Sequence, residues 1–164
     1  MDAFDIRPAR DEDRIPLAVL FAAVAEERDG IASEPPIDID ARAARWELDG
    51  SLLAEADGVI VGSIHVERSR FGFGEIGMAV ARDWRGRGVG SALLAAAIEW
   101  ARDEGMHKLS LSVFPHNAAA IALYRRFGFV EEGRRVKQYR RASGELWDTV
   151  DMGLLLESDE LRCS

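Results

Sequence analysis

Three glycines within five residues form the stretch of this sequence whose chemistry is easiest to interpret. Gly86, Gly88 and Gly90 follow one apolar run and lead directly into another. Glycine lets the backbone adopt positive φ and lets a ligand approach its amides, and the unpaired amides and dipole of a helix N-terminus attract an anion. Arg85 and Arg87 add positive charge in a geometry suited to phosphate. The stretch predicts a pyrophosphate-binding loop between a strand and a helix.

The spacing of this loop excludes two common kinds of phosphate site. A Walker loop ends in Gly-Lys-Ser/Thr, but neither lysine of the chain, Lys108 or Lys137, follows a glycine in such a loop. The dinucleotide fingerprint GxGxxG requires a third glycine where this sequence has Ser91. The remaining pattern, Arg-x-x-Gly-x-Gly over residues 85–90, resembles the acyl-coenzyme A loop of the GNAT acetyltransferases. A glycine-rich turn without a ligand is the alternative for this loop taken alone.

A second resemblance begins at Asn117, 27 residues beyond Gly90. Residues 117–129 match the Asn-x-x-Ala-x-x-Leu-Tyr-x-x-x-Gly-Phe segment that forms the other part of the GNAT coenzyme site. Two independent motifs in the right order are much rarer by chance than either motif alone. On these residues the chain is identified as a member of the GNAT family, and the resemblance extends from Ile6 to about Leu155.

The resemblance assigns residues to coenzyme binding and to catalysis. It implies acetyl-coenzyme A as co-substrate, a backbone amide near Met78 or Val80 as the donor to the oxyanion, and Tyr124 as the general acid for the departing thiolate. A tyrosine that only packs its helix against the sheet is the alternative for Tyr124. The residues expected to bind coenzyme A are Met78, Ala79, Val80, Arg85, Gly86, Arg87, Gly88, Val89, Gly90, Ser91, Asn117 and Tyr124. We expect no metal, because the three histidines are too scattered to form a site.

Acetyl transfer to an amine also needs a proton acceptor. An amine with a pKa of about 10.4 loses its proton at pH 7 at a cost of roughly 4 to 5 kcal/mol unless a base assists. A carboxylate acting through water is the usual base, and the candidates are Glu75, Glu26, Glu27 and His65. Glu75 is the first choice, because the resembling family often carries the base on this strand. A solvated charge, or an ordinary strand histidine, is the alternative for each of them.

Composition and charge exclude several other classes of protein. With 164 residues, 48% of them apolar, the chain suits one N-acetyltransferase domain over residues 1–164 with a polar tail from about 157. The net charge of −8 disfavours nucleic-acid binding and suits a cationic acceptor, although a solvated acidic surface is the commoner cause. No apolar run is long enough for a membrane span, and the single cysteine, Cys163, excludes an internal disulfide. We expect a cytoplasmic protein without membrane partners, and a homodimer stays open.

Hydrophobic patterning predicts the elements that position these residues. The expected strands cover residues 4–7, 51–56, 59–66, 74–80, 108–113, 129–140 and 146–156. The expected helices are one that ends at Gly30, one from Asp38 or Asp40 to Leu48, one over 90–104 and one over 117–128. Gly77 is expected to mark a bulge or a close approach of ligand to the central strand. The order indicates an α/β (α+β) fold, which the resemblance makes GNAT-like: a mixed, mostly antiparallel central sheet of six to seven strands with about four helices on its two faces.

The remaining aromatic residues carry weaker predictions. Trp46, Trp84, Trp100 and Trp147 are interpreted as core or dimer contacts, with the edge of the acceptor cleft as the alternative for Trp147. His116 is interpreted as a surface histidine, with a substrate contact as the alternative.

The residues and the resemblance together predict an acetyl-coenzyme A-dependent N-acetyltransferase. A primary amine would attack directly in a ternary complex, since the sequence places no nucleophile for a covalent intermediate. The expected acceptor is a small amine or an amino-acid-like molecule. A protein N-terminal or lysine acetyltransferase and a non-catalytic acyl-coenzyme A sensor are the alternatives. A sensor would not need Tyr124, and a protein acceptor would need an open groove, whereas the segment around Pro35 and Pro36 is long enough to form a lid.

Overall fold

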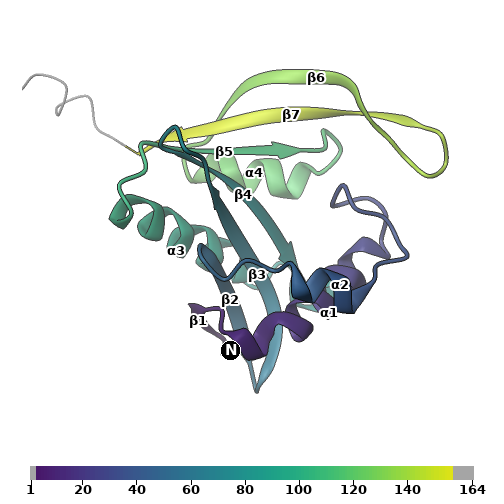
Figure 1. The fold of residues 1–164 in the computed structure, drawn as a ribbon. Coiled ribbons are helices and arrows are strands. Elements are labelled where there is room, and N and C mark those ends of the chain that lie inside the picture. The colour runs from purple at the N-terminus through teal and green to yellow at the C-terminus, as the bar shows by residue number, and fades with distance from the viewer. Residues whose placement is uncertain (1–2, 157–164) are drawn as a thin grey trace, which may run out of the picture.

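One mixed sheet of seven strands runs through residues 3–156, the part of the chain that the structure, a computed structural model, describes. The strands are β1 (Asp5–Pro8), β2 (Ser51–Ala56), β3 (Val59–Arg68), β4 (Phe73–Val80), β5 (Lys108–Val113), β6 (Val130–Arg140) and β7 (Leu146–Leu155). The α-helices are α1 (Arg14–Ala25), α2 (Ile39–Ala44), α3 (Val89–Asp103) and α4 (Ala118–Arg126). The strand order is β1-β2-β3-β4-β5-β7-β6, and only β4 and β5 pair in parallel. The predicted fold class is confirmed (Figure 1).

Helices cover both faces of this sheet, as Figure 1 shows. α3 lies on one face and buries one apolar side, which comprises Leu93, Leu94, Ala97, Ile98 and Ala101. α4 joins the same core through the buried side chain of Tyr124. α1 lies on the opposite face, where Leu17, Leu20 and Val24 are buried. β4, the fourth of the seven strands, therefore presents side chains to a helical layer on each face.

β4 and β5 stay together only at their beginnings. Their parallel pairing ends at Glu75 and Ser110, although β4 continues to Val80 and β5 to Val113. β5 instead pairs along its whole length with β7. The two strands diverge beyond this point (Figure 1). The edge of β4 that faces β5 therefore has no neighbouring strand from Ile76 onward. This divergence opens the sheet in its middle.

α1 ends at Ala25, and the prediction that it reaches Gly30 is wrong. Beyond Ala25 the hydrogen bonds connect residues that are closer in sequence, since the amide of Glu27 donates to the carbonyl of Val24. Arg28 then takes a left-handed conformation with φ of 61°. A helix cannot contain such a residue. The chain therefore leaves the helix early and forms a longer segment, residues 26–38, before α2.

α2 is also shorter than its pattern indicates, since it ends at Ala44 rather than at Leu48. Asp38 caps its first turn by accepting a hydrogen bond from the amide of Ala41 (3.0 Å), as expected for a start at this position. The helix stops because Trp46 turns inward and joins a small buried cluster on the α1 face. The other element boundaries agree with the predicted ones to within about two residues.

Gly77 does not form a bulge. β3 and β4 pair in one continuous register, in which Gly77 lies opposite His65. The nearest register shift lies one strand away, between β2 and β3 near Ala54 and Glu55, and the others lie between β6 and β7. A Cβ added to Gly77 would have no atom within 4 Å, so this glycine leaves open space beside the strand. The predicted close approach of a ligand to β4 at Gly77 stays a prediction.

Candidate active site

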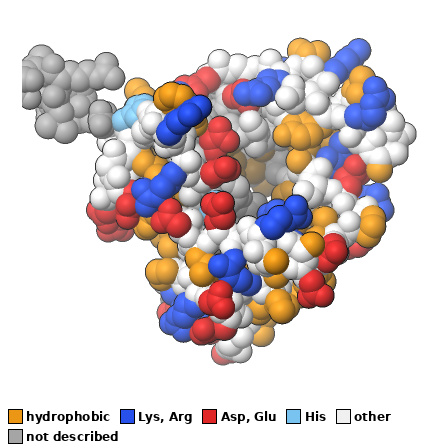
Figure 2. Space-filling view, viewed as in Figure 1, with side chains coloured by type: hydrophobic (Ala, Val, Ile, Leu, Met, Phe, Trp, Pro, Cys, Tyr) orange, Lys and Arg blue, Asp and Glu red, His pale blue; other side chains and the backbone are white. Residues whose placement is uncertain are grey.

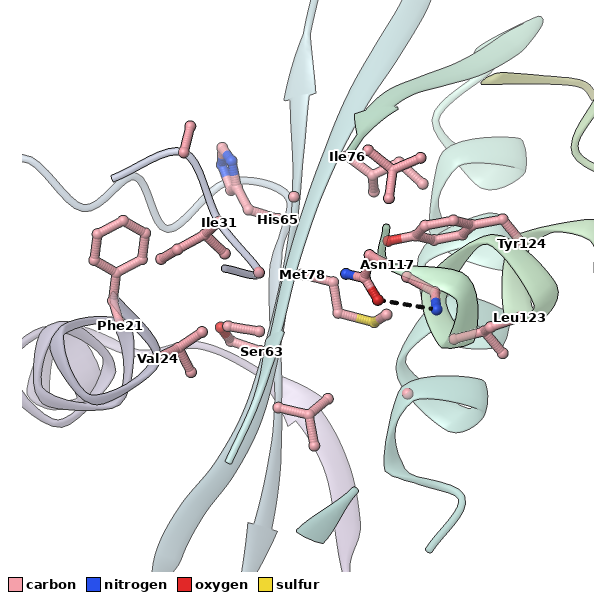
Figure 3. A pocket seen from close by; sticks show the side chains of 18 of the residues that line it. Phe21, Val24, Ile31, Ser63, His65, Ile76, Met78, Asn117, Leu123 and Tyr124 are labelled. Carbon is pink, nitrogen blue, oxygen red and sulfur yellow. Dashed lines mark hydrogen bonds between the residues drawn. The ribbon is translucent and has the colours of Figure 1, made fainter. Parts of the chain in front are cut away.

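A cavity of about 1130 Å³ extends to both sides of β4, where that strand leaves β5. Figure 3 places Ile76, Met78, Asn117, Leu123 and Tyr124 on one side of the strand, and Phe21, Val24, Ile31, Ser63 and His65 on the other. We call the first, together with residues 84–91, the α3 side. The second, together with residues 30–33, Arg42 and Trp46, is the α1 side. Figure 2 shows the molecule hollowed near the middle of one face, with acidic and basic side chains around the hollow.

The hydrogen bonds of β3 determine what the backbone of β4 presents to this cavity. The amide of Ala81 donates to the Val61 carbonyl (2.9 Å), and the same register continues along β4. Odd-numbered residues of β4 therefore bond to β3, and the amides of Met78 and Val80 point the other way, into the gap beside β5. The Val80 carbonyl points there as well, because it accepts a hydrogen bond from Arg85 Nε (3.1 Å).

The side chains of β4 alternate between the two sides of the cavity. Ile76 and Met78 pack toward the core that contains α3. Glu75 and Ala79 project toward α1, where Ala79 is buried and Glu75 is exposed. Val89, the first residue of α3, is buried at 1% exposure and turns away from solvent. Of the residues predicted to bind coenzyme A, Val89 can thus offer only backbone groups. Ala79 has its side chain on the α1 side, and its amide and carbonyl point toward β3.

The glycine loop leads into α3 without a side chain that caps its first amides. Gly86 (φ 72°) and Gly88 (φ 87°) both have positive φ, and Gly88 is the N-cap residue of α3. A Cβ on Gly90 would lie 3.2 Å from Leu123, so glycine here permits the close approach of α3 and α4. All three glycines and Ser91 line the cavity. A helix N-terminus of this kind can bind a phosphate group.

Both arginines of the loop make contacts within the protein. Arg85 donates through its two Nη atoms to the carboxylate of Glu27 (2.6 and 2.7 Å). The Arg85 guanidinium holds the pKa of Glu27 below its usual value. Arg87 donates to the Asp83 carbonyl (2.9 Å), and its guanidinium lies 3.9 Å from the centre of the Trp84 ring. Arg85 is thereby oriented toward α1, which the sequence motif did not indicate.

Asn117 and Tyr124 come from the two ends of α4 and line the α3 side. Asn117 Oδ1 accepts a hydrogen bond from the amide of Ala120 (3.3 Å), so Asn117 is the N-cap of α4. Tyr124 is 9% exposed, its ring packs against Phe129 at 5.7 Å, and its hydroxyl points toward β4 (Figure 3). Burial raises the pKa of Tyr124 to about 12, so the phenol keeps its proton at neutral pH.

Two of the four candidate bases, Glu75 and His65, line the cavity. They lie on adjacent strands of the α1 side, and His65 Nε2 is 3.1 Å from the carbonyl oxygen of Asp49. Glu26 and Glu27 are not among the residues that line this cavity, and they border a separate, smaller hollow at the end of α1. The carboxylate of Glu27 is in addition occupied by Arg85.

Arg141, which no sequence pattern singled out, holds the wall of the α1 side. Its side chain is buried, with Nη1 donating to the carbonyl of Ala32 (2.8 Å) and Nη2 to that of Arg28 (3.1 Å). The guanidinium also lies 4.4 Å from the Trp147 ring. Residues 30–33 line the cavity, so this contact fixes part of its boundary. The sequence has no signal for it, because Arg141 stands in a turn beside other arginines.

His116 and Trp147 belong to an aromatic cluster next to that wall. The His116 ring stacks on Phe114 (5.6 Å) and meets Trp147 edge-on (4.9 Å), while its Nε2 lies 2.7 Å from the Asp29 carbonyl oxygen. Trp147 does not line the cavity, whereas the buried Trp46 does. Of the two alternatives for Trp147, the structure therefore shows packing rather than the cleft edge.

Two structural observations apply to residues 3–156 alone. No three His, Cys, Asp or Glu side chains in that range are grouped so that they could hold a metal ion. None of its helices is long and apolar enough to cross a bilayer. Cys163 and the polar tail predicted from about 157 lie outside the described residues.

Comparison with known proteins gives consistent matches. The model of the acetyltransferase (GNAT) family matches residues 19–129. The L-amino acid N-acetyltransferase AaaT of Escherichia coli is 35% identical over 109 residues; the match covers 62% of this chain but only 65% of that protein. The chain thus spans less than two thirds of this curated relative.

Solved structures match over almost the full length. A ribosomal-protein-alanine N-acetyltransferase from Brucella melitensis has a TM-score of 0.84 and 31% identity, with 92% of this chain and 99% of that chain covered. An acetyltransferase structure from Salmonella typhimurium, solved with its cofactor acetyl-CoA, has a TM-score of 0.85 and 25% identity, with 95% of each chain covered. Because the family model spans more than half of the sequence and agrees with the fold, the chain belongs to the acetyltransferase (GNAT) family.

Proposed function

We propose that this chain transfers an acetyl group from acetyl-coenzyme A to the primary amine of a small molecule, by direct attack in a ternary complex. The cavity that reaches both sides of β4 is the observation that carries the proposal. On the α3 side, uncapped helix amides favour a pyrophosphate. On the α1 side, the exposed carboxylate of Glu75 favours a cationic amine. Acetyl-coenzyme A and the amine would therefore approach the edge of β4 from its opposite sides and meet there.

Residues 85–91 would bind the pyrophosphate of acetyl-coenzyme A through the amides at the start of α3. The free amides of Met78 and Val80 would bind the acyl-carrying arm along the edge that β5 leaves open. The residues fit this ligand, because glycine removes side chains from the loop and no side chain occupies the N-cap position. Asn117 and Tyr124 would line the same channel. Acetyl-coenzyme A itself supplies the thioester.

Three groups of the chain would then act on the reacting atoms. Glu75, directly or through water, accepts a proton from the ammonium of the acceptor, so that the amine nitrogen can attack the thioester carbon. The amide of Met78 or Val80 donates to the oxyanion that forms. The carbon–sulfur bond breaks as the new carbon–nitrogen bond remains, and Tyr124 donates its phenolic hydrogen to the departing sulfur. Tyr124 regains a proton from the nitrogen of the new amide, which still carries the extra one, so that coenzyme A leaves as the thiol and the product is neutral at that nitrogen. With a pKa of about 12, Tyr124 carries that hydrogen at pH 7.

A peptide N-terminus is the second candidate acceptor. It is favoured by the Brucella melitensis neighbour, which is named a ribosomal-protein-alanine N-acetyltransferase. The wall that Arg141 holds in place favours the small acceptor instead, because residues 30–33 border the α1 side and restrict a long chain. Short peptides and free amines must therefore both be tested.

The decisive experiment measures coenzyme A release from acetyl-coenzyme A with amines, amino acids and short peptides, for the wild type and for Tyr124→Phe. We expect turnover with a small amine and a loss of about 100-fold or more in kcat in the variant, with acetyl-coenzyme A binding retained. Tyr139→Phe is the matched control, because Tyr139 is the only other tyrosine, lies at the cavity and is exposed.

Three results would contradict the proposal, each in a different part. Absence of acetyl-coenzyme A binding would show that the glycine loop does not have the assigned role. Binding of acetyl-coenzyme A without turnover on any acceptor would favour the alternative of a non-catalytic acyl-coenzyme A sensor. Equal losses in Tyr124→Phe and Tyr139→Phe would remove the acid role from Tyr124 while leaving the transferase intact.

A further inference from the structure

Arg42 of α2 lies in the wall of the α1 side between two aromatic rings. The centre of its guanidinium is 3.9 Å from the centre of the Phe21 ring and 5.2 Å from that of the Trp46 ring. All three side chains line the cavity. Stacking on aromatic faces holds a guanidinium in a fixed plane and leaves its N–H groups directed outward along that plane.

This guanidinium has no hydrogen-bond acceptor among the residues that the structure describes. Arg42 Nε is buried without a hydrogen-bond partner, and no carboxylate among residues 3–156 forms an ion pair with Arg42. Burial, together with the like charge of Arg45, lowers its pKa. The contrast with Arg85 is clear, since that side chain has both Nη atoms on a carboxylate. A partly buried cation without a counter-ion is costly, and an anion in the cavity would remove that cost.

The same side of the cavity carries the opposite charge on its other wall. Glu67 of β3 and Glu75 of β4 lie directly opposite each other in the sheet, and both line the cavity. Like charges in this position destabilise the sheet unless a cation lies nearby. Arg135, whose charge interacts with Glu75, itself donates to Asp151 (2.9 Å). The α1 side thus offers an unpaired cation and a carboxylate pair to one ligand.

We infer that Arg42 binds a carboxylate of the acceptor, and that the acceptor is therefore an amino acid rather than a simple amine. The ammonium of such a zwitterion faces Glu75 and Glu67, and its carboxylate faces Arg42. This inference rests on the proposed function and names its substrate class. Arg42 acts in binding and makes no contact with the atoms that react, so its effect belongs mainly to KM.

The test compares matched acceptors that share one side chain: an L-amino acid, its carboxamide and the amine without the carboxyl carbon, for example L-leucine, L-leucinamide and 3-methylbutylamine. The proteinogenic L-amino acids are screened first, and the best is taken with its two analogues. We expect Arg42→Gln to lower kcat/KM for the amino acid by about 10- to 100-fold, mostly through KM, as for the loss of a charge-assisted hydrogen bond. The amide and the amine should change by less than about threefold.

Arg45→Gln is the matched control, because Arg45 is one turn along, lines the same cavity and is exposed. It should leave all three acceptors within about threefold of the wild type. Arg42→Lys keeps the charge without the planar fork and should fall between the wild type and Arg42→Gln for the amino acid alone. Acetyl-coenzyme A affinity and the unfolding temperature report on folding. A merely structural Arg42 would lower activity on all acceptors equally.

The wild type alone can overturn the inference even if Arg42→Gln does not fold. If the carboxamide and the simple amine are acetylated with the same kcat/KM as the amino acid, there is no carboxylate site, although the transferase activity remains. If no acceptor is acetylated at all, the proposed function itself fails. If amino acids are preferred but Arg42→Gln and Arg42→Lys keep that preference, another residue binds the carboxylate and the assignment to Arg42 is wrong.

Discussion

The two sides of the cavity are built in different ways. The α3 side comes mainly from two continuous stretches, residues 76–91 and 117–124, which include the three loop glycines and the outward-pointing amides of Met78 and Val80. The α1 side is assembled from α1, residues 30–33, α2 and the outward-facing residues of β3 and β4. Its wall is held by the hydrogen bond from Arg141 to Ala32, two residues that are 109 positions apart.

This difference suits binding of a common phosphate ligand on the α3 side and selection of a particular acceptor on the α1 side. Backbone amides on a short glycine loop can bind the same phosphate groups in many proteins, whatever surrounds them. Side chains such as Arg42 and Glu75 can change without disturbing that loop. The ion pair between Glu27 and Arg85 joins the end of α1 to the loop. If the two sides are as independent as their construction indicates, a mutation on one side should weaken binding of the ligand on that side and leave binding of the other ligand unchanged.

The largest expected effect is on the α3 side. Gly88→Ala should weaken acetyl-coenzyme A binding by about 10- to 100-fold, because an L-residue at φ of 87° costs about 1 to 2 kcal/mol and the loop shifts to relieve it. Isothermal titration calorimetry measures the affinity. Gly58→Ala is the control, since Gly58 has φ of 77° in the β2–β3 turn and equally open surroundings. Equal weakening in both variants would mean that the effect is on folding alone.

A smaller effect is expected from the wall of the α1 side. Arg141→Gln leaves the carbonyls of Arg28 and Ala32 without their donor, and should lower the free energy of unfolding by about 2 to 3 kcal/mol. The KM for the acceptor should rise about tenfold, while acetyl-coenzyme A affinity changes by less than about twofold. The exposed neighbour Arg140 supplies the control, Arg140→Gln. A matching loss of acetyl-coenzyme A affinity would show that the two sides are coupled.

The smallest effect is expected where the sides meet. Glu27→Gln removes a partly exposed ion pair and should lower the free energy of unfolding by less than about 1 kcal/mol at pH 7. The folded state lowers the pKa of Glu27 from its ordinary value of 4.5, so its contribution is fully present above 4.5 and is lost as pH falls through the lower pKa of the folded state. Urea unfolding at pH 7 and pH 3 checks this, with Glu26→Gln as control. A difference that persists at pH 3 would exclude the ion pair as its cause.

Most of the α3 side could be predicted from the sequence, because its features are local. The N-cap at Asn117, the glycine turn at residues 86–90 and the buried stripe of α3 each depend on neighbours within a few positions. The prediction for Arg85 as a phosphate ligand missed its contact with Glu27, 58 positions away. The end of α1 was misplaced for a related reason, since no sequence signal marks Arg28 for positive φ.

By itself, the sequence determined the order and type of the elements, the mixed sheet and the uncapped loop at the start of α3. Hydrophobic period and the ability of glycine to adopt positive φ are properties of short stretches, so they can be recognised without knowing which distant segments pack together. Only the tertiary structure decided that Glu75 and His65 line the cavity while Glu26 and Glu27 do not. It also decided that Arg42 lines the α1 side with no hydrogen-bond acceptor for its Nε within residues 3–156. Those outcomes depend on which distant segments pack together, and side-chain contacts across many residues form only when the whole core has closed.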